Sequence, residues 1–347
     1  MDSKTTELNE LFTAWGADFV NQDGMILPLR VSGAGAEYQA AHEACAIFDG
    51  GDRGWMEMSG DDTSDFLQRL LSSDIRTLST DGVQWSAMLD NKGHWISDLI
   101  LFGLHRGEMK LIGIDMPTCR QEIIQSKFEL MHFSENLSWS APTVARLMLI
   151  GPESPNFLNQ IGIDPKASDI DELLVIRRPD RGASCWELVG NSERISDYAR
   201  RLQQAGALPA GQVALDILRV EERIPRWGAD FNQDSTLPES NEWHRASLDK
   251  GCYTGQEVVA RINTYGKAPR QLCQLDFSGG TNPLHGHELQ DENGTTAGVV
   301  CSWVWSPVAD QAIGMGIVKR KYAHNNFVLK VLGADNGETA RVLIPKQ

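Results

Sequence analysis

Residues 250–257, Lys-Gly-Cys-Tyr-Thr-Gly-Gln-Glu, are the most informative stretch of the chain. Within it, Cys252 follows Lys250 by two residues and lies close to the start of a predicted short helix that begins at Gln256. The positive end of a helix and a nearby ammonium group both favour a thiolate over a thiol. Cys252 is therefore a candidate reactive cysteine. The alternative is a small buried hydrophobic residue, as most free cysteines are.

The rest of this octapeptide has features that would hold such a cysteine in place. Thr254 and Glu257 have the S/T-x-x-E spacing of a capping box, which predicts that Thr254 caps the helix and Glu257 completes the cap. Gly251 and Gly255 permit backbone angles or close approaches that a side chain would block. Together with Tyr253, these residues predict a fixed loop that holds the side chain of Cys252 as an ionised thiol.

Composition limits the classes of function. The chain has 347 residues, enough for roughly two or three domains, and its 41% hydrophobic and 23% charged residues are ordinary for a globular protein. No apolar run is long enough to span a bilayer, and the N-terminus lacks a signal core or an arginine-rich transit peptide. We therefore expect a cytoplasmic protein without a membrane partner, and nothing in the sequence requires more than a monomer.

Charge and cysteine spacing exclude two further classes. The formal net charge is −15, which repels phosphate backbones, so we expect no direct binding of nucleic acid. None of the six cysteines forms a C-x-x-C pair, and we predict no metal site. The cysteines are expected to be reduced thiols.

The element pattern predicts an α+β fold. Strands at 84–89 and 95–102 flank the turn Asp90–Gly93, and a helix is expected over 212–222. After Pro269 only strands and turns follow, which predicts a C-terminal all-β barrel. We place the domain boundary between residues 1–268 and 269–347. No G-x-G-x-x-G and no P-loop motif follows a strand, so a dinucleotide site is unsupported.

Two carboxylates are further candidates. Asp98 interrupts an otherwise apolar strand, where it either faces water or is buried with a partner, and strand alternation slightly favours water. Glu221 lies beside the apolar stripe of its helix. Its side chain either pairs with a nearby arginine or binds the amino groups of a fused ring such as a pterin.

The octapeptide K-G-C-Y-T-G-Q-E resembles the signature of the YgfZ group of folate-binding proteins, which act in the assembly or repair of iron–sulfur clusters. The wider chain resembles the glycine cleavage T-protein (aminomethyltransferase) superfamily, to which that group belongs. The similarity runs from about residue 37 into the barrel and includes Ala46–Asp49, Asp98-Leu99-Ile100 and the block 218–228.

This resemblance implies two T-protein-like α+β lobes around a central folate channel, plus the barrel, with tetrahydrofolate as the cofactor. Glu221 falls on the glutamate that contacts the pterin, and Asp98 on the aspartate assigned to the folate and the transferred carbon. Trp227 and Arg261, in matched blocks, are further expected folate contacts. Cys252 and Asp98 are the expected catalytic residues, and iron–sulfur client or assembly proteins are the expected partners.

The chain also departs from the T-protein pattern. Ser97 replaces the first aspartate of D-D-L, Gly50-Gly51 replaces the S-H that follows I-F-D, and the T-protein lacks the cysteine motif. We therefore expect a tetrahydrofolate-binding protein that supports iron–sulfur clusters. A folate-dependent aminomethyltransferase or methyltransferase is the alternative, and an interaction module that has lost its ligand is the third hypothesis.

Overall fold

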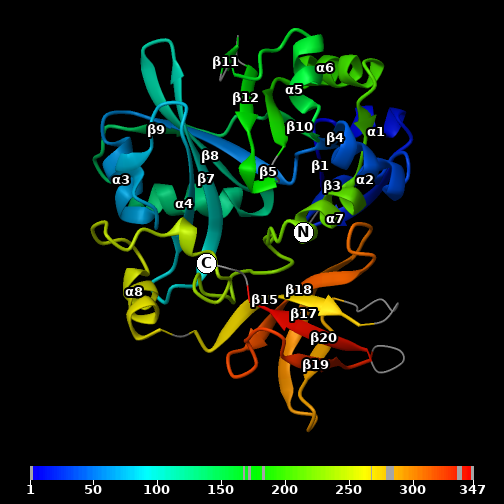
Figure 1. Ribbon diagram of the computed structural model, residues 1–347. Helices are drawn as coiled ribbons and strands as arrows, with labels where there is room; N and C mark the ends of the chain where they lie inside the picture. The colour runs from blue at the N-terminus through cyan, green and yellow to red at the C-terminus, as the bar shows by residue number, and fades with distance from the viewer. Residues whose placement is uncertain are drawn as a thin grey trace. The chain divides into compact units, whose positions relative to one another are not determined.

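The computed structural model describes residues 3–166, 169–170, 173–181, 184–266, 268–278, 285–333 and 338–344 (Figure 1). The chain divides into two compact units. The first comprises Met1–Phe66, Arg76–Gln84 and Leu99–Leu218, and the second comprises Leu67–Ile75, Trp85–Asp98 and Arg219–Gln347. Short segments around residues 70 and 90 thus belong to the same unit as the C-terminal third of the chain.

A six-stranded sheet forms one layer of the first unit. Its order is β11 (Asp169–Ile170), β12 (Leu173–Arg177), β13 (Cys185–Gly190), β10 (Ala145–Ile150), β4 (Ala46–Asp49), β14 (Leu208–Pro209). Strand β10 is buried along its whole length because it lies between antiparallel neighbours on both sides. Strands β10 and β13 pair with each other along their whole lengths.

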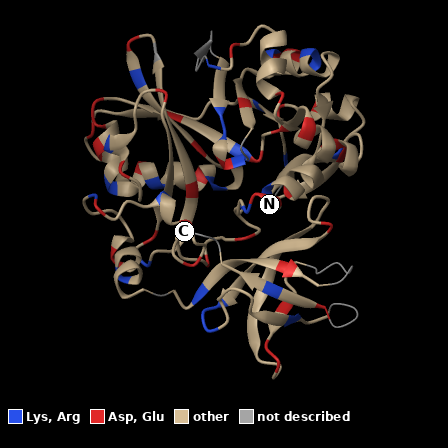
Figure 2. Cartoon of the chain, viewed as in Figure 1, with Lys and Arg blue, Asp and Glu red and all other residues tan. Residues whose placement is uncertain are grey.

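Short helices and a small second sheet accompany this layer. The helices are α1 (Asn9–Ala14), α2 (Ala34–Glu43), α5 (Ser154–Gln160) and α6 (Ser192–Gln204). The small sheet has the order β1 (Lys4–Thr5), β3 (Met25–Arg30), β2 (Asp18–Gln22). Apolar residues of α1, α5 and α6 share one core with the large sheet, including Phe12, Leu147 and Leu188. Helix α2 places Tyr38 and Ala41 in a second core with other residues of that sheet. Helix α6 carries both acidic and basic residues (Figure 2).

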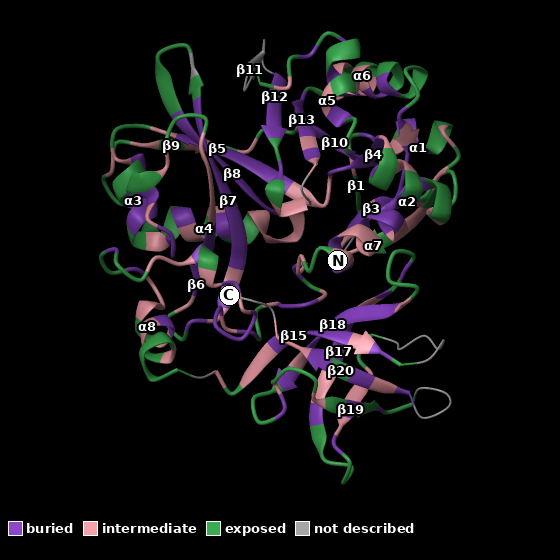
Figure 3. Ribbon diagram, in the orientation of Figure 1, coloured by how far each residue is buried: buried purple, intermediate pink, exposed green. Residues whose placement is uncertain are grey.

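A five-stranded sheet carries the predicted hairpin. Its order is β6 (Val83–Leu89), β7 (Trp95–Arg106), β8 (Met109–Pro117), β5 (Arg53–Ser59), β9 (Ser138–Ser140), and its helices are α3 (Thr63–Leu70) and α4 (Gln121–Met131). Gly93 has a φ of +76° in the turn between β6 and β7, which favours glycine there. Strands β7 and β8 are largely buried (Figure 3).

The predicted barrel is confirmed in the second unit. Six strands close on themselves in the order β15 (Arg270–Phe277), β18 (Gln311–Lys319), β17 (Thr296–Ser306), β16 (Glu288–Gln290), β19 (Val328–Val331), β20 (Thr339–Leu343). Leu275, Val300 and Ala312 are among the side chains that fill its core. The two remaining longer helices are α7 (Gln212–Glu221) and α8 (Gln256–Tyr265). The 3-10 helices are η1 (Ile75–Thr77), η2 (Thr118–Arg120), η3 (Pro179–Arg181) and η4 (Trp243–Arg245).

Among the described residues, no helix is long and apolar enough to cross a membrane. No group of three or more His, Cys, Asp or Glu side chains in those ranges is placed to hold a metal ion.

Candidate functional site

The octapeptide leads into α8 as predicted, but the helix is capped differently. Helix α8 begins at Gln256, and its N-cap is Gly255, which has a φ of 84° and provides no side-chain cap. Because the N-cap lies one residue after Thr254, the positions of Thr254 and Glu257 no longer correspond to N-cap and N3. The predicted capping box is therefore wrong. A Cβ atom at Gly255 would lie 2.6 Å from the carbonyl oxygen of Asp90, so glycine is what lets the helix start against the β6–β7 turn.

Lys250 fixes the start of the motif. Its side chain is only 7% exposed, and Nζ donates hydrogen bonds to three backbone carbonyl oxygens, those of Gln68 (2.8 Å), Leu71 (2.6 Å) and Ser73 (2.7 Å). An ammonium group has three protons, and these bonds use all of them. Lys250 therefore clamps the motif to residues 68–73 and does not donate a further hydrogen bond to a thiolate. An effect of its charge on Cys252 stays a prediction.

Cys252 differs from the other cysteines in its exposure. It is exposed, whereas Cys45, Cys185, Cys273 and Cys301 are buried and Cys119 is intermediate. Burial raises the pKa of Cys45 to about 11, and those of Cys273 and Cys301 to about 12. The buried thiols are thus held neutral and inert at ordinary pH. The alternative of a small buried residue does not describe Cys252.

Tyr253 is buried next to this exposed thiol. It is 7% exposed, and the Nζ of Lys250 lies 5.1 Å from the centre of its ring. Burial raises the pKa of its hydroxyl to about 12. Within the described part of the chain that hydroxyl has no hydrogen-bond partner. A buried hydroxyl of this kind is a place where a ligand or a water molecule can bind.

Asp98 is buried, so the slight preference for a water-facing side chain was wrong. It is 4% exposed, and its Oδ2 lies 4.0 Å from Nη2 of Arg245, which is also buried. Arg245 also donates from Nε to Oε2 of Glu242 at 2.7 Å. Alternation along one strand did not reveal this burial because the cationic partner comes from η4, far along the chain.

Residues 67–75 form hydrogen bonds both with the segment around Arg245, the partner of Asp98, and with the start of the cysteine motif. Ser72 donates from Oγ to the carbonyl oxygen of Arg245 at 2.5 Å, and the N–H of Ser247 donates to the carbonyl oxygen of Ser72 at 2.9 Å. Lys250 binds the same segment. Arg245 beside Asp98 and the start of the cysteine motif are therefore held on one backbone framework.

Sequence reasoning missed Arg245, Glu242 and His244. The ring of His244 packs edge-on against Trp85, with centroids 5.8 Å apart. Burial lowers the pKa of His244 and the charge of Arg245 adds to this, while the charge of Glu242 opposes it. The available signal was the polar run Glu242 to Arg245 directly upstream of the motif.

The expected folate contacts have three different environments. Glu221 ends α7, and its Oε1 accepts a hydrogen bond from Ser306 at 2.5 Å, so its partner is the barrel strand β17. Trp227 is buried, and its ring meets Phe231 edge-on at 5.7 Å. Phe231 in turn packs at 4.9 Å against Trp95 of β7, the strand that carries Asp98. Arg261 is exposed on α8.

Comparison with known proteins places the chain in a family. Residues 8–243 match the GCVT N-terminal domain, and residues 270–344 match the glycine cleavage T-protein C-terminal barrel domain. The chain belongs to the glycine cleavage T-protein family. It is 26% identical over 334 residues to an aminomethyltransferase of Staphylococcus carnosus, which covers 92% of this chain and 91% of that protein. It is also 26% identical over 349 residues to an aminomethyltransferase of Bacillus licheniformis, with 94% of each chain covered.

A solved structure supports the same fold. The glycine cleavage system aminomethyltransferase T from Bartonella henselae superposes with a TM-score of 0.91 at 20% identity, covering 99% of this chain and 97% of that one. At this identity the match concerns the fold alone. The predicted T-protein-like α+β fold with a C-terminal barrel is confirmed.

Proposed function

We propose that this member of the T-protein family is a tetrahydrofolate-binding protein that supports the assembly or repair of iron–sulfur clusters in client enzymes. The observation that carries the proposal is the exposure of Cys252 within a motif whose neighbours Lys250, Tyr253 and Gly255 are structurally fixed. A thiolate can react or bind a metal only where it is accessible. The resemblance of the octapeptide to the YgfZ group supplies the client class.

Tetrahydrofolate is the proposed cofactor because T-protein relatives bind it. Glu221, Asp98, Trp227 and Arg261 would hold it, within residues 1–268 as the folate-binding region, while residues 269–347 form the separate barrel domain. A carboxylate accepts hydrogen bonds from the amino group of a pterin, and a tryptophan offers it an apolar wall. The buried Asp98 beside Arg245 would orient a group of the folate, and Cys252 would act on a one-carbon or sulfur species or contact the cluster.

Folate binding can be tested by calorimetry with a matched pair of variants. Glu221→Gln removes the charge of the proposed pterin ligand, whereas Glu222→Gln changes the adjacent exposed residue. We expect binding of tetrahydrofolate by the wild type and by Glu222→Gln, and a loss of about tenfold or more for Glu221→Gln, because a hydrogen bond to a charged group contributes about 1.5–3 kcal/mol. Absence of folate binding by the wild type would exclude the proposal.

The role of the thiol can be tested by complementation. A strain lacking this protein would be rescued with the wild type, with Cys252→Ala or with Cys119→Ala, and several iron–sulfur enzymes would be assayed. We expect rescue by the wild type and by Cys119→Ala, and failure of Cys252→Ala at equal protein levels. Full rescue by Cys252→Ala would remove the thiol from the proposed function.

The second candidate is a folate-dependent aminomethyltransferase, and the names of the relatives at about one quarter identity favour it. In that function Asp98 would assist the developing charge at the transferred carbon. Turnover of an aminomethyl donor with tetrahydrofolate, abolished by Asp98→Asn and retained by the exposed control Asp234→Asn, would decide for it. Lack of turnover together with folate binding would favour the first proposal.

A further inference from the structure

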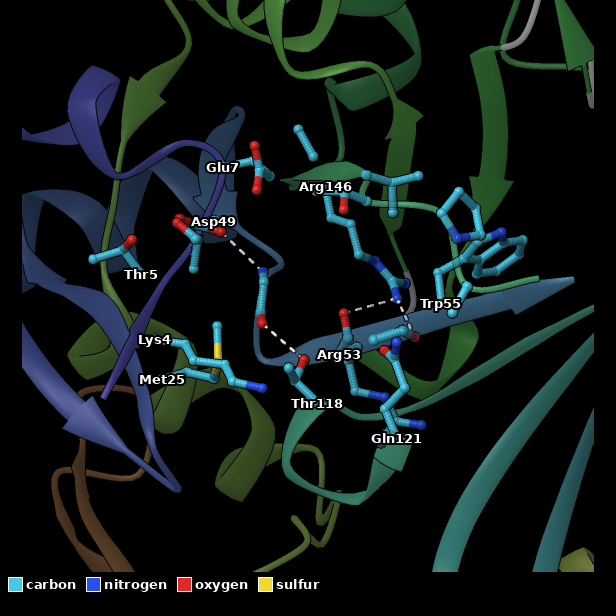
Figure 4. A pocket seen from close by; sticks show the side chains of 18 residues that line it. Lys4, Thr5, Glu7, Met25, Asp49, Arg53, Trp55, Thr118, Gln121 and Arg146 are labelled. Carbon is cyan, nitrogen blue, oxygen red and sulfur yellow. Dashed lines mark hydrogen bonds between the residues drawn. The ribbon is translucent and has the colours of Figure 1, made fainter. Parts of the chain in front are cut away.

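A cavity in the first unit is not used by the proposed function. It has a volume of about 240 Å³ and is formed by residues 4–7, the connection between β4 and β5, the chain around Thr118 and Gln121, and residues 141–146 (Figure 4). Ligand pockets for drug-sized molecules usually have volumes of about 300–1,000 Å³. This cavity therefore has the size for a smaller molecule.

Gly51 shapes its wall. A Cβ atom at Gly51 would overlap the Thr6 side chain, so glycine lets the N-terminal residues pack closely on the β4–β5 connection. At the neighbouring Gly50 a Cβ atom would lie 2.7 Å from Oε1 of Glu187. Thr6 donates from Oγ1 to Asp49, and Thr118 donates from Oγ1 to the carbonyl oxygen of Gly51 at 3.0 Å. The wall is fixed by hydrogen bonds at the positions where this chain departs from the T-protein pattern.

The polar groups that are not part of the buried ion network lie at two ends of the cavity. Glu7 and Asp49 lie in the upper part of Figure 4, whereas Lys4 and Gln121 lie in its lower part. The side chain of Arg146, drawn beside Glu7, belongs to the buried network. One end therefore offers carboxyl oxygens, which accept hydrogen bonds, and the other offers an ammonium and an amide, which donate them.

Several of these groups are available to a ligand. Among the described residues, the Glu7 carboxylate and the Gln121 amide have no hydrogen-bond partner for their side chains. Lys4 pairs with the exposed Glu122 at 2.9 Å, with both side chains more than half exposed, and such pairs contribute about 0–1 kcal/mol. Arg146, by contrast, is buried and already bound to Glu187 and Asp115.

We propose that this cavity binds a small zwitterion, an α-amino acid, with its ammonium group at Glu7 and Asp49 and its carboxylate at Lys4 and Gln121. The two ends of such a molecule match the two ends of the cavity in charge. Its side chain would lie against the apolar part of the lining, which includes the buried Trp55. This site does not depend on folate or on Cys252.

The test is calorimetric titration of the full-length protein with a panel of α-amino acids, with acetate and methylamine as half-ligands. We expect at least one amino acid to bind, and both half-ligands to bind at least about tenfold more weakly, because each satisfies one end only. Glu7→Gln and Gln121→Leu should each weaken binding about tenfold or more. The control Glu10→Gln, an exposed change on α1, should bind like the wild type.

Circular dichroism and the thermal midpoint would establish that the variants fold. Unchanged affinity in both folded pocket variants would overturn the proposal, as would the absence of binding by any amino acid of the panel. Equal binding of acetate and the amino acid would also overturn it, because the acidic end would then have no role. Cys252→Ala should bind the amino acid like the wild type, which separates this site from the proposed function.

Discussion

The buried ion network of the first unit and the cysteine motif of the second differ in how many of their polar groups are left to a ligand. Arg146 donates to both Glu187 oxygens, to Asp115 and to the carbonyl oxygens of Arg53 and Gly54. In the cysteine motif of the second unit, by contrast, Cys252 is exposed and the Tyr253 hydroxyl has no partner in the described ranges. The first arrangement stabilises the fold and leaves little for a ligand, whereas the second leaves groups that a ligand can engage.

The pKa of Asp115 shows how tightly the first network is coupled. Burial alone would raise it, but the guanidinium groups of Arg178, Arg53 and Arg146 hold the pKa of Asp115 well below its usual range. Removing one cation from such a network leaves buried carboxylates without compensation, which costs about 3–5 kcal/mol.

Arg146→Met is therefore the most damaging change that we predict. We expect it to lower the free energy of unfolding by about 3–5 kcal/mol in urea titrations. The control is Arg76→Met, which breaks an exposed pair with Asp65 and should cost less than about 1 kcal/mol. Equal losses in the two variants would show that the buried network stabilises the protein no more than an exposed ion pair does.

Asp49 makes a pH-dependent contribution to the stability of the first unit. Burial raises its pKa from 3.8 to about 7, and hydrogen bonds from Thr6 and Gly51 oppose the shift. Because the folded pKa is the higher one, the stabilisation by the bound proton is complete below about pH 4 and is lost as the pH rises toward 7. At about 1.4 kcal/mol per pKa unit, the loss over this window is about 4 kcal/mol.

Asp49→Asn should remove this dependence of the free energy of unfolding on pH. Urea unfolding of both proteins at several pH values between about 4 and 8 measures it, and the difference between the two profiles isolates Asp49 from the other carboxyl groups. If the stability of the two proteins changed with pH in the same way over the whole range, Asp49 would not be the group responsible.

Lys250→Met tests whether the motif depends on its clamp. The variant leaves three backbone carbonyl oxygens without their buried donor, and we expect a loss of at least about 3 kcal/mol, since each unsatisfied buried group costs about 1–3 kcal/mol. Lys92→Met, an exposed change in the β6–β7 turn, should stay within about 0.5 kcal/mol of the wild type. If the two variants unfold at the same urea concentration, Lys250 does not act as a clamp.

The two glycines of the motif allow a finer comparison. Alanine at Gly255 must adopt a φ near 84° with its Cβ atom 2.6 Å from the Asp90 carbonyl oxygen, and we expect a loss of about 1–3 kcal/mol. At Gly251 a Cβ atom would meet nothing within 4 Å, so Gly251→Ala should stay within about 0.5 kcal/mol. Thermal unfolding of both variants measures the difference, and similar losses would contradict this division of roles.

Local patterns predicted the elements well, because they depend on neighbouring residues. The all-strand character of the barrel and the start of α8 at Gln256 follow from alternation and glycine positions. The burial of Asp98 and the clamp made by Lys250 could not be predicted, since their partners Arg245 and residues 68–73 are distant in sequence. The capping box failed because a left-handed glycine shifted the cap by one residue.

Cys252→Ala has a very small expected effect on stability. It therefore tests directly whether the cysteine motif, unlike the buried ion network, serves a ligand or a reaction. The side chain is exposed, so its removal leaves no cavity, and the free energy of unfolding should change by less than about 0.5 kcal/mol. The same truncation at the buried Cys273 should cost more, because it removes atoms from the barrel core. If a fully stable Cys252→Ala protein failed to rescue the strain, the thiol would have a chemical role. A large loss of stability would instead indicate a structural role.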